Sequence, residues 1–147
     1  MTTLIKIENL SFAYSPKSMI LSNINISIDQ GEWVAIQGPS GSGKSTLLYL
    51  IGGLLSVQQG SIEIAGKNIA TYSDLELAYF RNRNMGFVFQ QFHLLPKTTL
   101  LQNILMPTIY PCELTSPSRR KREVQQKRGI ALAERLGIGG PLLQQHP

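Results

Sequence analysis

A glycine-rich stretch between residues 38 and 46 has the residue types best suited to chemistry in this sequence. It reads Gly38-Pro39-Ser40-Gly41-Ser42-Gly43-Lys44-Ser45-Thr46, which fits the spacing G-x-x-x-x-G-K-[ST] of a Walker A phosphate loop. Backbone N–H groups of such a loop point into one concavity at the start of a helix and bind phosphate oxygens. Lys44 adds a charge for the β- and γ-phosphates, and the Ser45 hydroxyl can ligate Mg²⁺.

The elements that must position this loop are predicted on either side of it. Residues 33–36 form a short apolar run, typical of a buried strand. Residues 46–51 are apolar all round, which predicts a buried helix. The alternative is a Gly/Ser turn that happens to precede a lysine. The order strand, loop, helix favours phosphate binding over that alternative.

Further strands are predicted before and after the loop. Residues 4–28 look like paired strands around a turn segment at 12–17, and their second strand ends with three isoleucines on one face, Ile24, Ile26 and Ile28. Residues 61–69 predict a strand with Ile62 and Ile64 inward, followed by a glycine turn. A second short buried strand is predicted at 86–89.

Helices dominate the expectations for the rest of the chain. Ser73 and Glu76 have the spacing of a capping box, which predicts a helix from there to about Asn84. Residues 94–106 are expected to be helical in part, interrupted by Pro96. An irregular connection is expected at three prolines, Pro107, Pro111 and Pro117. One further helix is predicted over 118–136, ended by Gly137.

Composition sets limits on the class of protein. The 147 residues are 42% hydrophobic, which is enough for one domain with a core. The net charge of +5 is a mild surplus, and the basic run at 119–122 is interpreted as a solvated face, so no nucleic-acid partner is expected. Cys112 is the only cysteine, so no intrachain disulfide can form. The apolar run at 47–55 is about half of a bilayer span, and the start lacks a signal-peptide pattern.

Several blocks together resemble the ATP-binding subunits of ABC transporters. Residues 10–14 (Leu-Ser-Phe-Ala-Tyr) are similar to the aromatic A-loop of that family, and residues 60–66 are similar to its antiparallel hairpin. Residues 86–90 (Gly-Phe-Val-Phe-Gln) resemble the strand that leads to its Q-loop. Residues 93–96 (His-Leu-Leu-Pro), followed by Asn103-Ile104, resemble most the group that drives lipoprotein release and macrolide export.

The resemblance implies an α/β fold with a P-loop NTPase core. We expect an incomplete parallel sheet with an N-terminal antiparallel β subdomain over about 1–92, and the start of a helical subdomain over about 93–147. It also implies that Tyr14 stacks on adenine while residues 38–46 bind the phosphates of ATP. Lys44 and Gln90 are the expected catalytic residues, with Ser45 and Gln90 at Mg²⁺. Without the resemblance, Tyr14 is an ordinary half-exposed aromatic and Gln90 merely ends a strand.

The resemblance further implies partners and a location. A complete subunit of this kind hydrolyses ATP between two head-to-tail copies and drives export or lipoprotein release through membrane-spanning subunits. Such a subunit lies in the cytoplasm, peripherally on the cytoplasmic face of the inner (plasma) membrane.

The carboxylates that ATP hydrolysis requires in this family are not recognisable here. The only aspartates are Asp29, before the phosphate loop, and Asp74, at a polar helix start. A Walker B strand ending in Asp-Glu and the Leu-Ser-Gly-Gly-Gln signature are expected beyond Pro147. The sequence is therefore expected to be an N-terminal portion that is inactive and poorly soluble alone. Alternatives are a non-catalytic nucleotide-binding or regulatory module and, less favoured, a small P-loop kinase.

Overall fold

The computed structural model describes residues 2–109 and 119–147. Internal contacts divide the chain into two compact units, Met1–Arg81 and Asn82–Pro147, and each is described by itself. Four residues named above, Pro111, Cys112, Pro117 and Ser118, lie outside the described residues.

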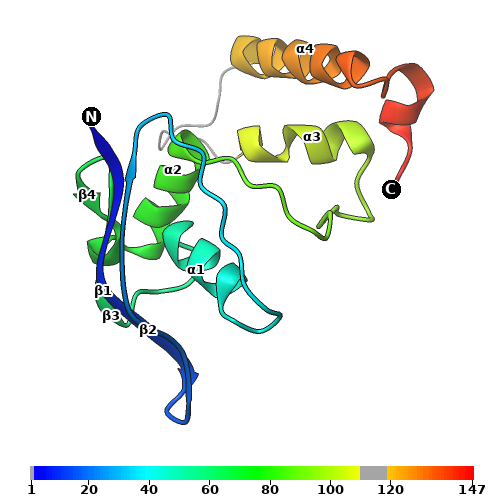
Figure 1. Cartoon of the computed structure of the whole chain (residues 1–147). Coiled ribbons are helices and arrows are strands. Elements are labelled where there is room, and N and C mark those ends of the chain that lie inside the picture. The colour runs from blue at the N-terminus through cyan, green and yellow to red at the C-terminus, as the bar shows by residue number, and fades with distance from the viewer. Residues whose placement is uncertain (1, 110–118) are drawn as a thin grey trace. The chain divides into compact units, whose positions relative to one another are not determined.

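The first unit is built on a four-stranded antiparallel sheet. Its strands are β1 (Thr3–Ser15), β2 (Ser18–Asp29), β3 (Gln59–Ile64) and β4 (Lys67–Asn68), in the order β2-β1-β3-β4. The two longest, β1 and β2, form the twisted ribbon of Figure 1, which confirms the predicted pairing. The predicted turn at 12–17 was too long, because Phe12 pairs with Leu21 and only Pro16 and Lys17 connect the strands.

Matched bulges keep the apolar side chains of both long strands on one face. Ile7 and Leu10 of β1 are both buried although they are three residues apart, which a regular strand with a period of two cannot achieve. Asn9 between them has a φ of 51°, and the β1–β2 register shifts there. Asn23 of β2 has a φ of 50°. Asparagine tolerates this left-handed conformation better than most residues, so both bulges are specified locally.

Side-chain hydrogen bonds hold these bulges in place. The Asn9 N–H donates to Asn25 Oδ1 at 2.9 Å, and the Asn23 N–H donates to Ser11 Oγ at 3.0 Å. Asn25 Nδ2 in turn donates to the Asn23 carbonyl oxygen at 3.0 Å. After the bulge, Leu10, Phe12 and Tyr14 share the apolar face of β1.

The core of the first unit combines this face of the sheet with helix α1 (Lys44–Ile51) and the short 3₁₀ helix η1 (Ile69–Thr71). Its buried apolar residues are Ile7, Leu10, Phe12, Leu21, Leu47, Leu50, Ile62, Ile64 and Ile69. Ile62 and Ile64 point inward as predicted. The predicted all-round burial of α1 was wrong, since Leu48 is 54% exposed on its outer side.

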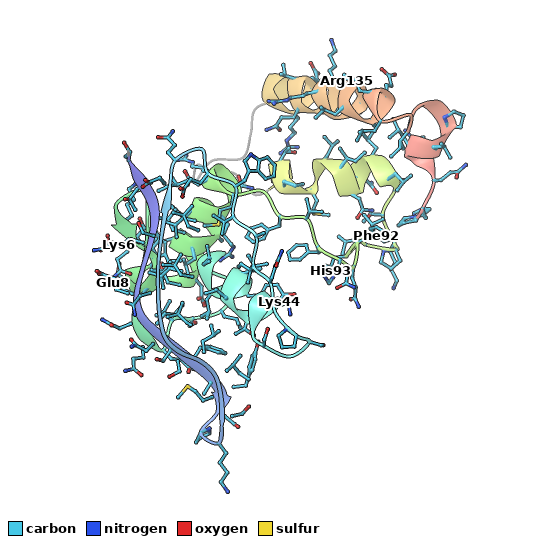
Figure 2. All side chains as sticks on the ribbon, in the orientation of Figure 1. Lys6, Glu8, Lys44, Phe92, His93 and Arg135 are labelled. Carbon is cyan, nitrogen blue, oxygen red and sulfur yellow. The ribbon has the colours of Figure 1, made fainter. Side chains whose placement is uncertain are left out.

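The opposite face of β1 is polar. Lys6 and Glu8 project from this strand in Figure 2, and their charged groups lie 2.7 Å apart. The hydrogen bond that Lys6 donates to Glu8, together with the attraction of the Glu8 charge, raises the pKa of Lys6 above its usual value. Because both side chains are solvated, the pair adds little to stability.

Helix α2 (Asp74–Asn84) begins with the predicted capping box and ends where the sequence indicated. The Ser73 N–H donates to Glu76 Oε2 at 2.8 Å, and the Ser73 hydroxyl donates to the same oxygen at 2.7 Å. These hydrogen bonds lower the pKa of Glu76, because they stabilise its carboxylate form.

Neither of the two predicted buried strands is formed. Residues 33–38 and 86–89 have no regular secondary structure, and no parallel strand pair occurs within residues 2–109 and 119–147. Trp33 and Val88 are fully exposed. A strand requires a neighbour for its backbone N–H and C=O groups, and the described residues offer these two segments none.

The second unit contains helices α3 (Leu100–Ile109) and α4 (Arg119–Arg135) and the 3₁₀ helix η2 (Gly140–Gln144). Leu101, Ala133 and Leu143 form its buried cluster, one from each element. Helix α3 begins after Pro96, but it continues through Pro107, where the sequence predicted an irregular connection. Helix α4 ends as predicted, with the Ile138 N–H donating to the Ala133 carbonyl oxygen and the Gly137 N–H to that of Glu134.

Candidate functional site

The phosphate loop meets the first turn of α1, where backbone N–H groups are available for an anion. Gly43 is the N-cap, and no side chain among the described residues caps this helix. Its first turn contains no acidic residue. Helix N-termini have unpaired N–H donors and a partial positive charge, so this end of α1 suits a phosphate group.

Gly43 is required by the packing of the loop as well as by its backbone. Its φ is 89°, a conformation that residues with a side chain rarely adopt. A Cβ at this position would lie 2.9 Å from Leu21 Cδ2 and 3.0 Å from Ile20 Cγ2. The start of α1 therefore rests directly on β2, and a larger residue would have to displace the side chains of Leu21 and Ile20.

Lys44 holds the loop in a closed curve. Its ammonium group donates to the carbonyl oxygens of Gly38 at 3.0 Å and Pro39 at 2.7 Å, and it lies 3.4 Å from Ser42 Oγ. Figure 2 shows the Lys44 side chain near the start of α1. The charge is thereby kept at the concave side of the loop, where an incoming phosphate would meet it.

Tyr14 reaches the same region from the end of β1. Its hydroxyl lies 3.3 Å from Thr46 Oγ1, and its ring contacts the edge of Phe12 with centroids 5.0 Å apart. Thr46 is buried on α1, whereas Tyr14 is 60% exposed. The Tyr14 side chain is therefore held by Thr46 and Phe12, while the exposed part of its ring is accessible to a flat ligand.

A cavity of ≈ 370 Å³ joins these features. Its lining consists of Tyr14, Ile20, Ser40, Gly41, Gly43, Lys44, Ser45 and Thr46. Most of the predicted binding residues thus meet around one space, from two segments about thirty residues apart in the sequence. An ammonium, a helix N-terminus and an aromatic ring around one cavity fit a polyanion that carries a planar base.

The donors also fit Mg²⁺ bound together with a nucleotide. Ser45 is exposed and is one of the residues that line the cavity. In the part of the chain that the structure describes, no three His, Cys, Asp or Glu residues group as a metal site. One protein oxygen with phosphate and water ligands is a usual environment for Mg²⁺.

Gln90 belongs to the second unit, where it is exposed and directly follows residues 86–89. The rings of Phe87 and Phe89 stack 5.6 Å apart before it, and the Phe89 ring meets the His93 ring edge-on at 5.1 Å. His93 thus has an aromatic contact with Phe89.

Two glutamines with structural roles were missed by the sequence interpretation. Gln58 forms a pair of hydrogen bonds with the backbone of Ala13, next to Tyr14, and no motif indicates this contact. Gln102 and Thr99 cap the start of α3, since the Thr99 N–H donates to Gln102 Oε1 and the Gln102 N–H donates to Thr99 Oγ1. The spacing T-x-x-Q would have predicted that second contact.

A family model described as "ABC transporter" matches residues 21–145 of the sequence. The chain belongs to the ABC transporter family. The ATP-binding domains of this family are ATPases. The prediction that the sequence belongs to a family of ATP-binding ATPases is therefore confirmed.

Named relatives in this family are export and release proteins. The macrolide export ATP-binding/permease protein MacB of Rhodopirellula baltica is 43% identical over 84% of this chain and 17% of its own length. The lipoprotein-releasing system ATP-binding protein LolD of Alcanivorax borkumensis is 41% identical over 87% of this chain and 53% of its own length. The lipoprotein-releasing system ATP-binding protein LolD 2 of Rhodospirillum rubrum is 43% identical over 82% of this chain and 50% of its own length. The chain thus spans about half the length of the LolD relatives.

Solved ABC structures share the fold. The dimeric ATP-binding cassette MJ0796 in a post-hydrolysis state, bound to ADP and Pi, superposes with a TM-score of 0.82 and 34% identity. The match covers 98% of this chain and 62% of that one. The expected fold class, a P-loop NTPase with an antiparallel β subdomain, is confirmed by this likeness, although the parallel strands are not formed here. No helix of the described residues is long and apolar enough to cross a membrane.

Proposed function

We propose that this chain binds ATP with Mg²⁺ in the cavity between Tyr14 and the phosphate loop, as the ATP-binding part of an ABC transporter. The observation that carries the proposal is that Tyr14 and residues 40, 41 and 43–46 line one cavity although different parts of the sequence supply them. The named relatives act in macrolide export and in lipoprotein release, which supports the same activity for a protein containing this chain.

Each residue of the cavity has a distinct role in this proposal. The first N–H groups of α1 and the Lys44 ammonium bind the phosphates, and the Tyr14 ring stacks on the base. The Ser45 hydroxyl is the protein ligand of Mg²⁺, which when bound offsets negative charge on the phosphates. Gln90 is proposed, from the family resemblance, to orient the attacking water.

Partners and location follow from the relatives. We propose that the protein acts with membrane-spanning subunits on the cytoplasmic face of the inner membrane, because the LolD and MacB names describe export and release systems. Pairing with a second ATP-binding subunit is proposed because the similar cassette structure is dimeric.

Binding is tested by titrating the 147-residue chain with ATP and Mg²⁺ in a calorimeter. Lys44→Ala removes the loop's ammonium and is expected to weaken binding by more than about tenfold, since hydrogen bonds to charged groups are strong. Lys67→Ala, at an exposed lysine of β4, is the matched control and is expected to bind as the parent does. Equal affinity in parent and Lys44→Ala proteins would contradict the proposal.

Turnover is a separate question from binding. We expect this chain to bind ATP without hydrolysing it, because neither of its aspartates follows an apolar strand beyond the phosphate loop. A phosphate-release assay with the same proteins measures this. Steady release that Lys44→Ala abolishes would contradict this expectation and show that the 147-residue chain suffices for catalysis.

A further inference from the structure

Among the described residues, the end of β1 that carries Tyr14 has no strand neighbour on the side of β3. On its other side β1 still pairs with β2, as Ala13 does with Met19. On the β3 side, the last pair of residues is Ser11 with Gln59. Beyond Ser11, the outward N–H and C=O groups of β1 would therefore point into solvent, where strand ends fray easily.

The side chain of Gln58 takes the place of the missing strand. The Ala13 N–H donates to Gln58 Oε1 at 3.0 Å, and Gln58 Nε2 donates to the Ala13 carbonyl oxygen at 2.9 Å. A primary amide presents one acceptor and one donor side by side, as a strand residue does toward its neighbour. A single side chain thereby extends the ladder by one residue.

This contact acts on the residue next to Tyr14. The Tyr14 ring itself has two described contacts, a hydroxyl 3.3 Å from Thr46 Oγ1 and the edge of Phe12. Both depend on the direction in which the β1 backbone leaves Ala13. Gln58 is exposed and is not among the residues that line the cavity, so it can affect a ligand only through the backbone.

We propose that Gln58 is a positioning residue for the nucleotide base, which it orients by locking Ala13 and hence the Tyr14 ring. This inference rests on the proposed function, because it assigns the base to Tyr14. It predicts that loss of the Gln58 amide weakens binding of ligands with a base and leaves binding of the bare phosphate chain unchanged.

The test compares Gln58→Met with Gln59→Met in the full chain. Methionine keeps the length of glutamine but forms neither backbone hydrogen bond. Gln59 is the matched control, because it is the adjacent glutamine and its side chain makes no hydrogen bond with the described residues. Each protein is titrated with ATP and Mg²⁺ and, separately, with inorganic triphosphate and Mg²⁺.

We expect Gln58→Met to bind ATP about fivefold more weakly and triphosphate with parental affinity, while Gln59→Met changes neither. In a Tyr14→Ala background, Gln58→Met is expected to have no further effect on ATP affinity, since the ring through which it acts is gone. Parental ATP affinity in Gln58→Met would overturn the inference. An equal loss for both ligands would also overturn it, because Gln58 would then act on the phosphate loop.

Nuclear magnetic resonance separates this inference from the proposed function. Gln58→Met is expected to speed hydrogen exchange of the Ala13 amide by about tenfold and to weaken the proton cross-relaxation between the Tyr14 and Phe12 rings. If the parent chain binds no ATP, the proposed function fails, and these two signals still decide whether Gln58 positions the ring. Unfolding of Gln58→Met alone would show that Gln58 supports the sheet as a whole, and would overturn the assignment.

Discussion

Tyr14 illustrates how a proposed binding residue depends on structure elsewhere in its own strand. Its ring lies over the cavity because the bulge at Asn9 places residues 10, 12 and 14 on the face toward α1. The hydroxyl contact with Thr46 is long, at 3.3 Å, whereas the ring itself packs at a right angle to the Phe12 ring, with centroids 5.0 Å apart. We therefore expect the aromatic surface to matter more for binding than the hydroxyl group.

Substitution of Tyr14 tests this expectation. Tyr14→Ala is expected to weaken ATP binding by about five- to hundredfold, because stacking on an aromatic ring contributes about 1–3 kcal/mol. Tyr14→Phe keeps the ring and is expected to stay within about twofold of the parent. Calorimetric titration with ATP and Mg²⁺ measures both. A large loss in Tyr14→Phe would transfer the main role to the hydroxyl and its contact with Thr46.

Site residues whose contacts are local in the sequence could be predicted, whereas those with contacts distant in the sequence could not. The phosphate loop is predicted from nine consecutive residues, because its backbone N–H groups, Lys44 and Ser45 all belong to one local structure. Tyr14 is indicated only by family resemblance, since nothing in its own neighbourhood specifies Thr46 as a contact. Gln58 is missed, because a side chain that replaces a strand leaves no periodic signal.

Among the elements, β1 depends on a glycine of β3. Gly60 has a φ of 88°, and a Cβ there would lie 2.5 Å from the Glu8 carbonyl oxygen and 2.6 Å from the Asn9 carbonyl carbon. The β1–β3 register shifts at this point, between Glu8 and Ser11. Gly60 thus allows β3 to approach the bulge that turns Tyr14 toward the phosphate loop.

Gly60→Ala is expected to lower the free energy of unfolding by about 3 kcal/mol, because it combines a strained φ with a clash against backbone atoms. Gly66→Ala is the matched control: its φ is 74°, but a Cβ there meets nothing within 4 Å. The control is expected to lose only about 1 kcal/mol from backbone strain. Urea unfolding followed by circular dichroism measures the free energy of unfolding of both variants. Equal losses would show that the backbone shifts to relieve the clash at Gly60.

The capping box of α2 predicts a dependence of stability on pH. The hydrogen bonds from Ser73 lower the pKa of Glu76 in the folded state. Its contribution to stability is therefore fully present above the ordinary glutamate pKa and is lost as the pH falls through the lower, folded-state pKa.

Glu76→Gln removes this titration. We expect the parent to be more stable than Glu76→Gln at neutral pH, and the difference to shrink steadily below the ordinary glutamate pKa. Urea midpoints measured for both proteins between neutral and acidic pH test this. A difference that stays constant across that range would assign the contribution to packing instead of the carboxylate.

There is a physical reason why some helices and strands were predicted correctly and others wrongly. The hairpin of β1 and β2 was predicted because a short turn joins two neighbouring strands, and helix α2 because its cap lies within three residues. Residues 33–36 and 86–89 were predicted as strands from apolarity alone, which indicates a preference for burial but names no neighbour. Without a neighbouring strand their backbone cannot form a ladder, and the side chains stay exposed.

At the scale of the whole molecule, these two segments place contiguous apolar residues on the surface of each unit. The exposed residues are Trp33, Val34 and Ile36 in the first unit and Phe87, Val88 and Phe89 in the second. Contiguous apolar exposure of this kind favours association or aggregation. Poor solubility of the chain alone, expected from the sequence, therefore stays a prediction.

A double substitution tests that expectation. Val34→Lys with Val88→Lys is expected to lower aggregation and binding of an apolar dye, because it places a charge in each segment. The control is Val124→Lys, at a valine of α4 that is also exposed but lies among charged residues. Light scattering at increasing concentration compares the proteins. If Val124→Lys lowers aggregation as much as the double substitution does, the effect comes from net charge and not from the two apolar segments.

The ammonium of Lys44, tied to the carbonyl oxygens of Gly38 and Pro39, bears on how quickly a ligand is captured. Because the loop is already curved around the Lys44 ammonium, it needs little conformational rearrangement when an anion binds. Nucleotide capture by this chain should therefore be governed by encounter with the cavity, with the lysine moving only from carbonyl oxygens to phosphate oxygens.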